Sequence, residues 1–190
     1  MKNKNLKNKK ILIGISSGIA IYKICSLIRL FIRNESQVKV VMTENATKLI
    51  SPIVFESLSQ SPVYISMFNP ISSDKIEHIY LANWADIFIL APATANTIGK
   101  IANGIADNLL TTVILALPEK TPLIIAPAMD ENMWKNVFFQ ENLKKIKKRK
   151  NCYIIKPKKG LLASGKIGIG RMAEINEIFK ITQKILERKK

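Results

Sequence analysis

The chain has 190 residues, of which 47% are apolar and 23% are charged, and its formal net charge is +16. This length suits one domain with a single core, and the composition is that of a globular rather than a disordered protein. No stretch approaches the ~20 consecutive apolar residues of a membrane-spanning helix, and the basic N-terminus lacks a convincing cleavage site, so we expect a cytoplasmic protein with no membrane partner.

The positive charge is concentrated in Lys-rich runs over residues 1–10, 144–150 and 187–190. Such runs mark solvated surfaces or contacts with polyanions. Because no aromatic residues interleave with the first run and no nucleic-acid-binding motif accompanies any of them, we predict a solvated surface and no nucleic-acid partner. Residues 1–9 are predicted to form a basic disordered tail. The same positive field would attract phosphorylated small molecules.

The two cysteines, Cys25 and Cys152, lie far apart and form neither a CxxC pair nor a zinc-binding spacing. We therefore expect two buried, reduced thiols rather than a disulfide. No metal site is expected.

Apolar runs of strand length alternate along the chain with segments whose apolar residues recur at helical spacing. The patterns predict strands over 10–18, 37–43, 86–93, 121–128 and 151–156, the first ending in a tight turn, and helices over 19–33, 51–60, 94–117 as one helix or two, 136–150 and 175–186. This alternation predicts an α/β fold over residues 10–190, a single-domain doubly wound, Rossmann-like parallel sheet with helices on both faces.

Half of the eight glycines lie in one stretch, residues 160–172, between the fifth predicted strand and the last helix. This stretch is too long for a simple turn. A Gly-rich loop of that length is usually functional or disordered.

Polar side chains follow three of the predicted strands, at the sheet edge where ligands of such folds bind. Hydroxyls and backbone N–H groups after the first strand suit a phosphate, but the stretch is neither GxGxxG nor a P-loop, and a plain tight turn explains it equally well. Hydroxyls after the second and third strands are also explained as helix caps. Three clusters at successive strand ends favour a phosphorylated ligand; their members are Ser16, Ser17 and Gly18, then Thr43, then Thr94, Asn96 and Thr97.

His78 is the single His of the chain and lies in KIEHIYLANW. A lone His is more often a surface or hydrogen-bonded structural residue than a catalyst. The residue pattern by itself therefore gives His78 no role.

Five segments, taken in order, resemble the homo-oligomeric flavin-containing Cys decarboxylases: ISSGIAIYK, TENAT, IEHIYLANWADIFILAPATANTIGKIANGIADNLL, APAMDENMW and ASGKIGIGRM. The resemblance runs from about Lys10 to the last helix and is strongest to the branch that acts on phosphopantothenoylcysteine in coenzyme A biosynthesis. It implies FMN as cofactor, decarboxylation of 4'-phosphopantothenoylcysteine to 4'-phosphopantetheine, and a homo-oligomer that is a trimer or a dodecamer. It also implies a separate phosphopantothenate–cysteine ligase as partner.

The resemblance also implies site residues, position by position. The FMN phosphate and ribityl chain would contact Ser16, Ser17, Gly18 and Thr43, and the isoalloxazine ring would lie over Thr94, Ala95, Asn96 and Thr97. His78 would be the catalytic base. The substrate would be held by Ala128, Met129 and Asp130, with Lys166 and Arg171.

Asp130 departs from the family pattern, which usually has Asn at this position. An ionised Asp about 4 Å from the substrate carboxylate would cost about 4 kcal/mol at an effective dielectric constant of about 20. Asp130 must therefore be protonated, turned away, or offset by a cation such as Lys166.

Ser164 is a second departure, because the family's proton-donating Cys occupies that position. A thiol with a pKa of about 8.5 releases its proton far more readily than a hydroxyl. Either another group protonates the ene-thiol formed by decarboxylation, or the reaction stops there. We expect residues 160–172 to act as a lid and the product to be phosphopantetheine.

Three other functions compete with this interpretation. A non-catalytic flavin-binding regulatory subunit is favoured by Ser164 and Asp130 but disfavoured by His78 and by the presence of the substrate-holding segment at residues 128–130. A flavin prenyltransferase shares the fold, although APAMDENMW and IEHIYLANW argue against it. Polyanion binding by the Lys runs would show a steep dependence on salt concentration.

Overall fold

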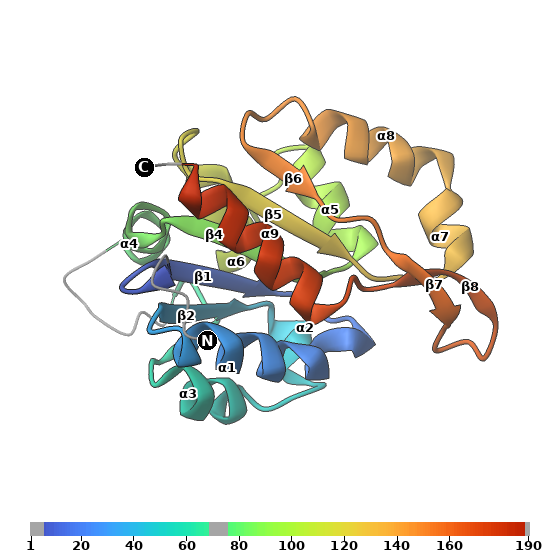
Figure 1. Cartoon of the computed structure of the whole chain (residues 1–190). Helices are drawn as coiled ribbons and strands as arrows, with labels where there is room; N and C mark the ends of the chain where they lie inside the picture. Colours follow the sequence, from blue (N-terminus) through green and yellow to red (C-terminus); the bar gives the residue numbers. More distant parts are fainter. Residues whose placement is uncertain (1–5, 69–75, 189–190) are drawn as a thin grey trace.

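A six-stranded sheet lies at the centre of the computed structural model, which describes residues 6–68 and 76–188 (Figure 1). The strands are β1 (Lys10–Ile15), β2 (Gln37–Met42), β3 (Val63–Tyr64), β4 (Ile87–Ala93), β5 (Leu123–Pro127) and β6 (Cys152–Ile154). They lie in the order β3-β2-β1-β4-β5-β6, and all neighbouring pairs are parallel. The strand order reverses between β1 and β4, which is where open α/β sheets bind ligands.

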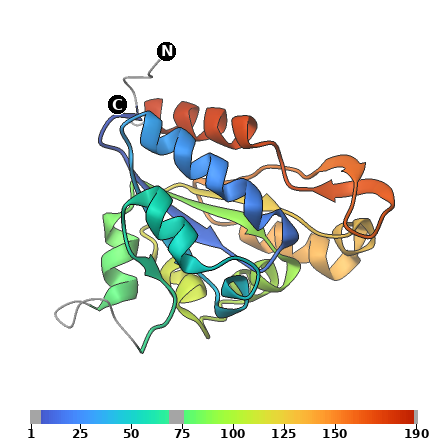
Figure 2. The same ribbon diagram turned by 90° about the horizontal axis from the view of Figure 1, so that it is seen from below.

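Helices cover both faces of the sheet. One face carries the 3-10 helix η2 (Ile19–Lys23) and the helices α1 (Ile24–Arg33), α3 (Pro52–Ser59) and α9 (Ile175–Glu187). The other face carries α4 (Glu77–Trp84), α5 (Ala95–Ala102), α6 (Leu109–Ala116) and α8 (Val137–Ile146). Figure 2 shows α1 and α9 side by side on the first face. Two short helices, α2 (Glu44–Thr47) and α7 (Glu131–Lys135), follow β2 and β5.

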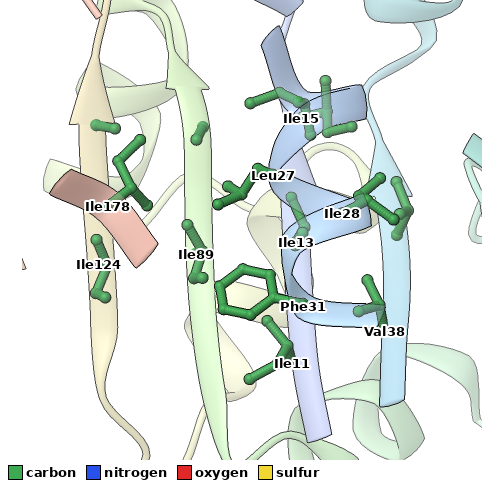
Figure 3. Close-up of a cluster of buried hydrophobic side chains, with 14 of the residues drawn as sticks. Ile11, Ile13, Ile15, Leu27, Ile28, Phe31, Val38, Ile89, Ile124 and Ile178 are labelled. Atoms are coloured by element: carbon green, nitrogen blue, oxygen red, sulfur yellow. The ribbon is translucent and has the colours of Figure 1, made fainter. Parts of the chain in front are cut away.

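Alternate residues of each central strand point to the two helical layers. Ile11 and Ile13 of β1 pack with Leu27, Ile28 and Phe31 of α1 (Figure 3), whereas Leu12 packs in the opposite cluster. Because both faces are covered, the strands are apolar at nearly every position. The predicted doubly wound parallel sheet is confirmed.

The element boundaries differ from the sequence-based ones in a few places. Residues 94–117 form two helices, since Asn103 ends α5 and Asn108 caps α6 through its side chain. The helix predicted over 136–150 ends at Ile146. The edge strand β3 was not predicted, because two residues are too few to show a periodic pattern.

The predicted disordered tail is wrong for its last four residues, and residues 1–5 lie outside the described residues. Leu6 is fully buried in the core around α1 and α9. Its carbonyl oxygen accepts a hydrogen bond from the Ser36 hydroxyl at 3.0 Å, and the Asn8 N–H donates to the Glu35 carbonyl at 2.8 Å. An apolar side chain between lysines therefore anchors this part of the chain to the domain.

The Gly-rich stretch is an ordered antiparallel hairpin rather than a loop. It consists of β7 (Lys158–Leu161) and β8 (Ile167–Arg171), with Leu161 opposite Ile167. In the turn, Gly165 has a φ of 78°, which favours glycine. We call residues 158–171 the hairpin. Its strands were missed because lysines and glycines obscure the alternation of a strand.

Several sequence-level expectations concern the surface and the cysteines. The lysines of residues 144–148 are exposed, as expected for a solvated surface.

Both cysteines are free and partly buried, and burial raises the pKa of the Cys152 thiol to about 11. Over residues 6–68 and 76–188, no helix is long and apolar enough to cross a membrane, and no acid, His or Cys cluster could hold a metal ion.

Candidate functional site

Ser16 connects the ends of β1 and β4 at the switch point of the sheet. Its side chain is 1% exposed. The hydroxyl donates to the Pro92 carbonyl at 2.7 Å and accepts from the Thr94 N–H at 2.9 Å. The structure therefore gives the Ser16 hydroxyl two partners within the chain, so its main role here is to fix the two strand ends.

The neighbouring residues Ser17 and Gly18 lead into the 3-10 helix η2. Ser17 is exposed, and Gly18 is the N-cap residue of η2. A Cβ on Gly18 would lie 3.4 Å from the Pro92 ring and 3.7 Å from Thr94. The turn after β1 thus passes close to the turn after β4 and leaves Ser17 facing outward.

Thr43 and Thr94 are helix caps, as their positions in the sequence allowed. The Thr43 hydroxyl accepts from the Ala46 N–H at 3.3 Å, and the Thr94 hydroxyl accepts from the Thr97 N–H at 3.3 Å. The Thr94 and Thr97 hydroxyls are also 3.1 Å apart. These contacts set the directions in which α2 and α5 leave the sheet.

The ends of β1, β2 and β4 open into one pocket of about 250 Å³. Four of the predicted cofactor residues line it: Ser17, Thr43, Asn96 and Thr97. The rest of the lining comes from the segment after β3, from α2, from Lys100 of α5, and from the residues before and within α6. We call this cavity the hydroxyl pocket. It confirms that these strand ends converge.

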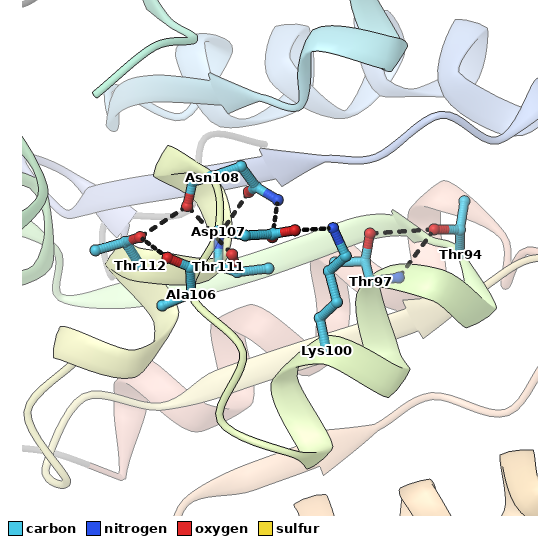
Figure 4. A network of polar contacts seen from close by, with 8 residues as sticks. All are labelled: Thr94, Thr97, Lys100, Ala106, Asp107, Asn108, Thr111 and Thr112. Carbon is cyan, nitrogen blue, oxygen red and sulfur yellow. Dashed lines mark hydrogen bonds and ion pairs between the residues drawn. The ribbon is translucent and has the colours of Figure 1, made fainter. Parts of the chain in front are cut away.

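A polar network on one wall of the hydroxyl pocket was not predicted (Figure 4). Lys100 Nζ forms an ion pair with Asp107 Oδ2 at 2.5 Å. Asn108 donates to Asp107 at 3.0 Å and accepts from the Thr111 N–H at 3.0 Å. The ion pair with Lys100 lowers the pKa of Asp107. One residue in the sequence could have indicated part of this network. Asn108 is an N-cap residue type just before the apolar run of α6, and it predicts a helix start there.

The segment Ala128–Asp130, which we call the clamp, follows β5 and lies against the hairpin. The Met129 N–H donates to the Gly170 carbonyl at 3.1 Å. The Ile169 N–H donates to Glu131 Oε1 at 3.2 Å. A Cβ on Gly170 would collide with the Met129 carbonyl oxygen, so only glycine permits this approach.

Asp130 and Ser164, the two departures from the family pattern, contact each other. The Ser164 hydroxyl donates to Asp130 Oδ2 at 3.1 Å, and Asp130 Oδ1 accepts from the Asn132 N–H at 2.9 Å as the cap of α7. Lys166 is exposed and forms no ion pair with Asp130 in the described part of the chain, so the idea that it offsets Asp130 finds no support here. Arg171 is paired with Glu174 at 3.1 Å.

His78 lies away from these residues within one chain. It is half-buried on α4, whose surface adjoins Lys10 at the start of β1. The clamp follows the opposite, carboxyl end of β5. Both views place α4 at the other end of the molecule from α7 and the hairpin (Figures 1 and 2).

Comparison with known proteins identifies the family. The profile described as Flavoprotein matches residues 1–187. The chain belongs to the flavoprotein family. Flavoproteins bind a flavin, and the hydroxyl pocket suits one, because hydroxyls, side-chain amides and Lys100 line a cavity at the switch point.

Two named relatives of this flavoprotein match nearly all of its residues. It is 41% identical over 180 residues to the "probable phosphopantothenoylcysteine decarboxylase" of Streptococcus mutans, covering 95% of this chain and 98% of that protein. It is 42% identical over 179 residues to the coenzyme A biosynthesis bifunctional protein CoaBC of Bacillus subtilis, covering 94% of this chain. The chain spans 43% of the length of that bifunctional relative.

Two solved structures match nearly the whole chain. A Cys-to-Ser variant of phosphopantothenoylcysteine decarboxylase, complexed with pantothenoylaminoethenethiol, matches with a TM-score of 0.84 and 33% identity, covering 95% of this chain and 100% of that one. The FMN-binding protein AtHal3 matches with a TM-score of 0.81 and 32% identity, covering 96% of this chain and 98% of that one.

Proposed function

We propose that this flavoprotein is an FMN-dependent phosphopantothenoylcysteine decarboxylase, a carboxy-lyase that converts 4'-phosphopantothenoylcysteine to 4'-phosphopantetheine in coenzyme A biosynthesis. The observation that carries the proposal is that the hydroxyl pocket and the clamp lie at the same, carboxyl edge of one sheet. A cofactor and the reacting end of a substrate would therefore meet there. The relative from Streptococcus mutans and the structure with an ene-thiol ligand support the choice of substrate.

FMN is the flavin we propose, since AtHal3 is an FMN-binding protein of the same fold. Ser17, Thr43, Asn96 and Thr97 would hold it, with Gly18, Thr94 and Ala95 shaping the turns around them. Ser16 would act indirectly by fixing the ends of β1 and β4. When bound, the flavin supplies the two-electron redox chemistry, and the protein supplies position and a dry environment.

The catalytic site is proposed to form between two copies of the chain. His78, the proposed base for the substrate thiol, is on α4, and α4 lies at the opposite end of the molecule from α7 and the hairpin. The hydroxyl pocket of about 250 Å³ is also below the roughly 300–1,000 Å³ typical of complete ligand sites. A homo-oligomer, a trimer or an assembly of trimers, would bring His78 of one copy to the clamp of the next.

The clamp and hairpin would hold the Cys-derived end of the substrate. Ala128, Met129 and Asp130 contribute the clamp, and Lys166 and Arg171 lie on the hairpin beside it. Docking of the hairpin would exclude water from the reactive intermediates. The substrate would be supplied by a phosphopantothenate–cysteine ligase, and we expect the protein to act in the cytoplasm, without nucleic-acid or membrane partners.

The direct test is to incubate the purified protein with phosphopantothenoylcysteine and identify the product by mass spectrometry. We expect the protein to purify with FMN and to release CO₂ and phosphopantetheine. A protein that neither carries nor takes up FMN would contradict the cofactor assignment. A protein that binds FMN but leaves the substrate unchanged would instead be a flavin-binding subunit without turnover.

A second outcome is favoured by one observation. The related Cys-to-Ser variant was solved with pantothenoylaminoethenethiol, and Ser164 is a serine in this chain's hairpin. The ene-thiol as sole product would identify a decarboxylase that stops before reduction.

A further inference from the structure

Lys39 lies inside a cage of three aromatic rings that the proposed function does not use. Its Nζ is 5.1 Å from the centroid of the Tyr64 ring, 4.9 Å from that of Tyr80 and 5.3 Å from that of Trp84. The ammonium also donates a hydrogen bond to the Tyr64 hydroxyl at 2.8 Å. We call Tyr64, Tyr80 and Trp84 the aromatic cage.

The aromatic cage takes the place of an acidic partner for a partly buried cation. Among the described residues, no carboxylate lies within ion-pair distance of Lys39. Burial would lower the pKa of Lys39, but hydrogen bonds to the Tyr64 and Tyr80 hydroxyls outweigh it and raise the pKa. Lys39 therefore stays charged, and its interaction with the rings is strong because the site is partly shielded from water.

The rings come from two short elements that need outside support. Tyr64 is on β3, a two-residue strand at the sheet edge. Tyr80 and Trp84 are on α4, an eight-residue helix without a side-chain cap at its N-terminus. An isolated helix of this length has little stability in water. The position of α4 therefore depends on packing against the rest of the domain. Lys39 of β2, the strand next to β3, supplies part of that packing.

Both elements lead to the proposed site. β3 continues into residues 65–68, which form one wall of the hydroxyl pocket. Met67 in that wall accepts a hydrogen bond from the Thr112 hydroxyl of α6 at 3.3 Å. α4 carries His78, two residues before Tyr80. One ammonium group thus joins the strand before the pocket wall to the helix that bears the proposed base.

We propose that Lys39 is a positioning residue that sets the orientation of His78 and of the pocket wall through the aromatic cage. This inference rests on the proposed function for the catalytic part of the argument. Lys39 itself touches no reacting atom. Its loss should misplace the base, and misplacements of about 1 Å can cost two orders of magnitude in rate.

The test compares Lys39→Met, which keeps the length of the side chain but removes its charge, with Lys39→Arg, which keeps a cation that stacks on aromatic rings. We expect Lys39→Met to lower kcat about tenfold while KM stays within about twofold of the parent. Lys39→Arg should recover most of kcat. FMN titrated into the cofactor-free protein should bind several times more weakly to Lys39→Met, because the pocket wall is loosened.

A matched control separates positioning from general stability. Phe31→Leu removes a fully buried ring on the opposite face of the sheet. There the ring of Phe31 packs on that of Phe179, with the ring centroids 5.3 Å apart. This substitution should lower the melting temperature, but Phe31 is not part of the aromatic cage, so the cage should keep its geometry. We therefore expect kcat within about twofold of the parent once the protein is assayed below its melting transition.

A second readout does not depend on activity. His78 is the only His in the 190-residue chain, so selective ¹³C labelling of His gives one imidazole signal that reports on α4. Lys39→Met should move or broaden this signal, and Phe31→Leu should leave it in place. Equal effects of the two variants on the signal and on kcat would overturn the inference. If the parent protein proves inactive, the proposed function fails, and the His78 signal alone decides whether Lys39 positions α4.

Discussion

The Ser164 hydroxyl donates a hydrogen bond to Asp130 Oδ2 across 3.1 Å, and this contact joins the tip of the hairpin to the cap of α7. The two residues that depart from the family pattern are therefore partners. The hydroxyl proton of Ser164 points to a carboxylate rather than to open solvent, so Ser164 is better placed as a latch between hairpin and clamp than as a proton donor.

The first prediction follows from this orientation. If another group or a bound water protonates the ene-thiol, then Ser164→Ala and Ser164→Cys should both give phosphopantetheine, with kcat within about threefold of the parent. Mass spectrometry of the products checks this. A large gain of reduced product in Ser164→Cys alone would show instead that the serine limits the protonation step.

The second prediction concerns the charge of Asp130. Asp130→Asn keeps the oxygen that caps α7 and replaces the oxygen facing Ser164 by an amide NH2, which can donate to the Ser164 hydroxyl. It also removes a negative charge near the proposed position of the substrate carboxylate. Because Asp130 is only half-buried, solvent screens the repulsion, and we expect KM to fall by about tenfold rather than by the full unscreened amount. Asp130→Ala is the control, since it removes both charge and cap and should destabilise the helix. An unchanged KM in Asp130→Asn would place the substrate carboxylate elsewhere.

The third prediction tests the docking of the hairpin on the clamp. Gly170→Ala places a Cβ against the Met129 carbonyl oxygen, so the hairpin should detach and kcat/KM should fall at least about tenfold. The core around β1 does not contact this position, and the melting temperature should fall by only a few degrees. Gly99→Ala is the matched control, because its Cβ would meet only Asn142 Nδ2 at 3.6 Å. Similar activity losses in both variants would argue against a specific role for docking.

How far the sequence predicts this site depends on the range of the interactions. The strand ends that carry Thr43 and Thr94 could be found, because a parallel sheet brings the ends of buried runs to one edge. The contact between Asp130 and Ser164 could not, since 34 residues separate them. Their approach depends on the hairpin, in whose strands glycines and lysines obscure the alternation.

The aromatic cage shows the same limit. Lys39 occupies a strand position that appears solvent-facing by its residue type, although the rings of Tyr64, Tyr80 and Trp84 cover it. Two of these rings come from α4, which packs on the sheet far along the chain from β2. Only the packed structure shows that these rings partly bury the lysine.

The fourth prediction concerns pH. The pKa of Glu131 is lowered, first by the hydrogen bond from the Ile169 N–H and then by Lys135. A lowered pKa means that the ionised form stabilises docking, so the contribution is complete above the ordinary Glu pKa of 4.5 and is lost as the pH falls through the lower value of the folded state. The Ile169 amide should therefore lose protection from hydrogen exchange in acid before the amides of β4 do. Glu131→Gln should remove this pH dependence, and an unchanged pH dependence would assign it to another group.

The fifth prediction addresses the proposed sharing of the site between copies. His78 is on α4, and the pair of Asp130 and Ser164 is at the start of α7. Figure 1 shows α4 and α7 at opposite ends of one chain. His78→Ala should abolish decarboxylation while the protein keeps FMN, because the proposed base acts on the substrate and not on the cofactor. Gly170→Ala should lower decarboxylation because the hairpin no longer docks on the clamp.

Mixed oligomers, formed by unfolding and refolding the two variants together, should contain some sites with an intact His78 from one copy and an intact clamp from the other. These sites should restore decarboxylation to well above the level of either variant refolded alone. Refolding each variant separately and then mixing, without exchange of subunits, is the control. If co-refolded mixtures that demonstrably contain both variants are no more active than Gly170→Ala refolded alone, each site must be built from a single chain, and the proposed role of His78 would fail.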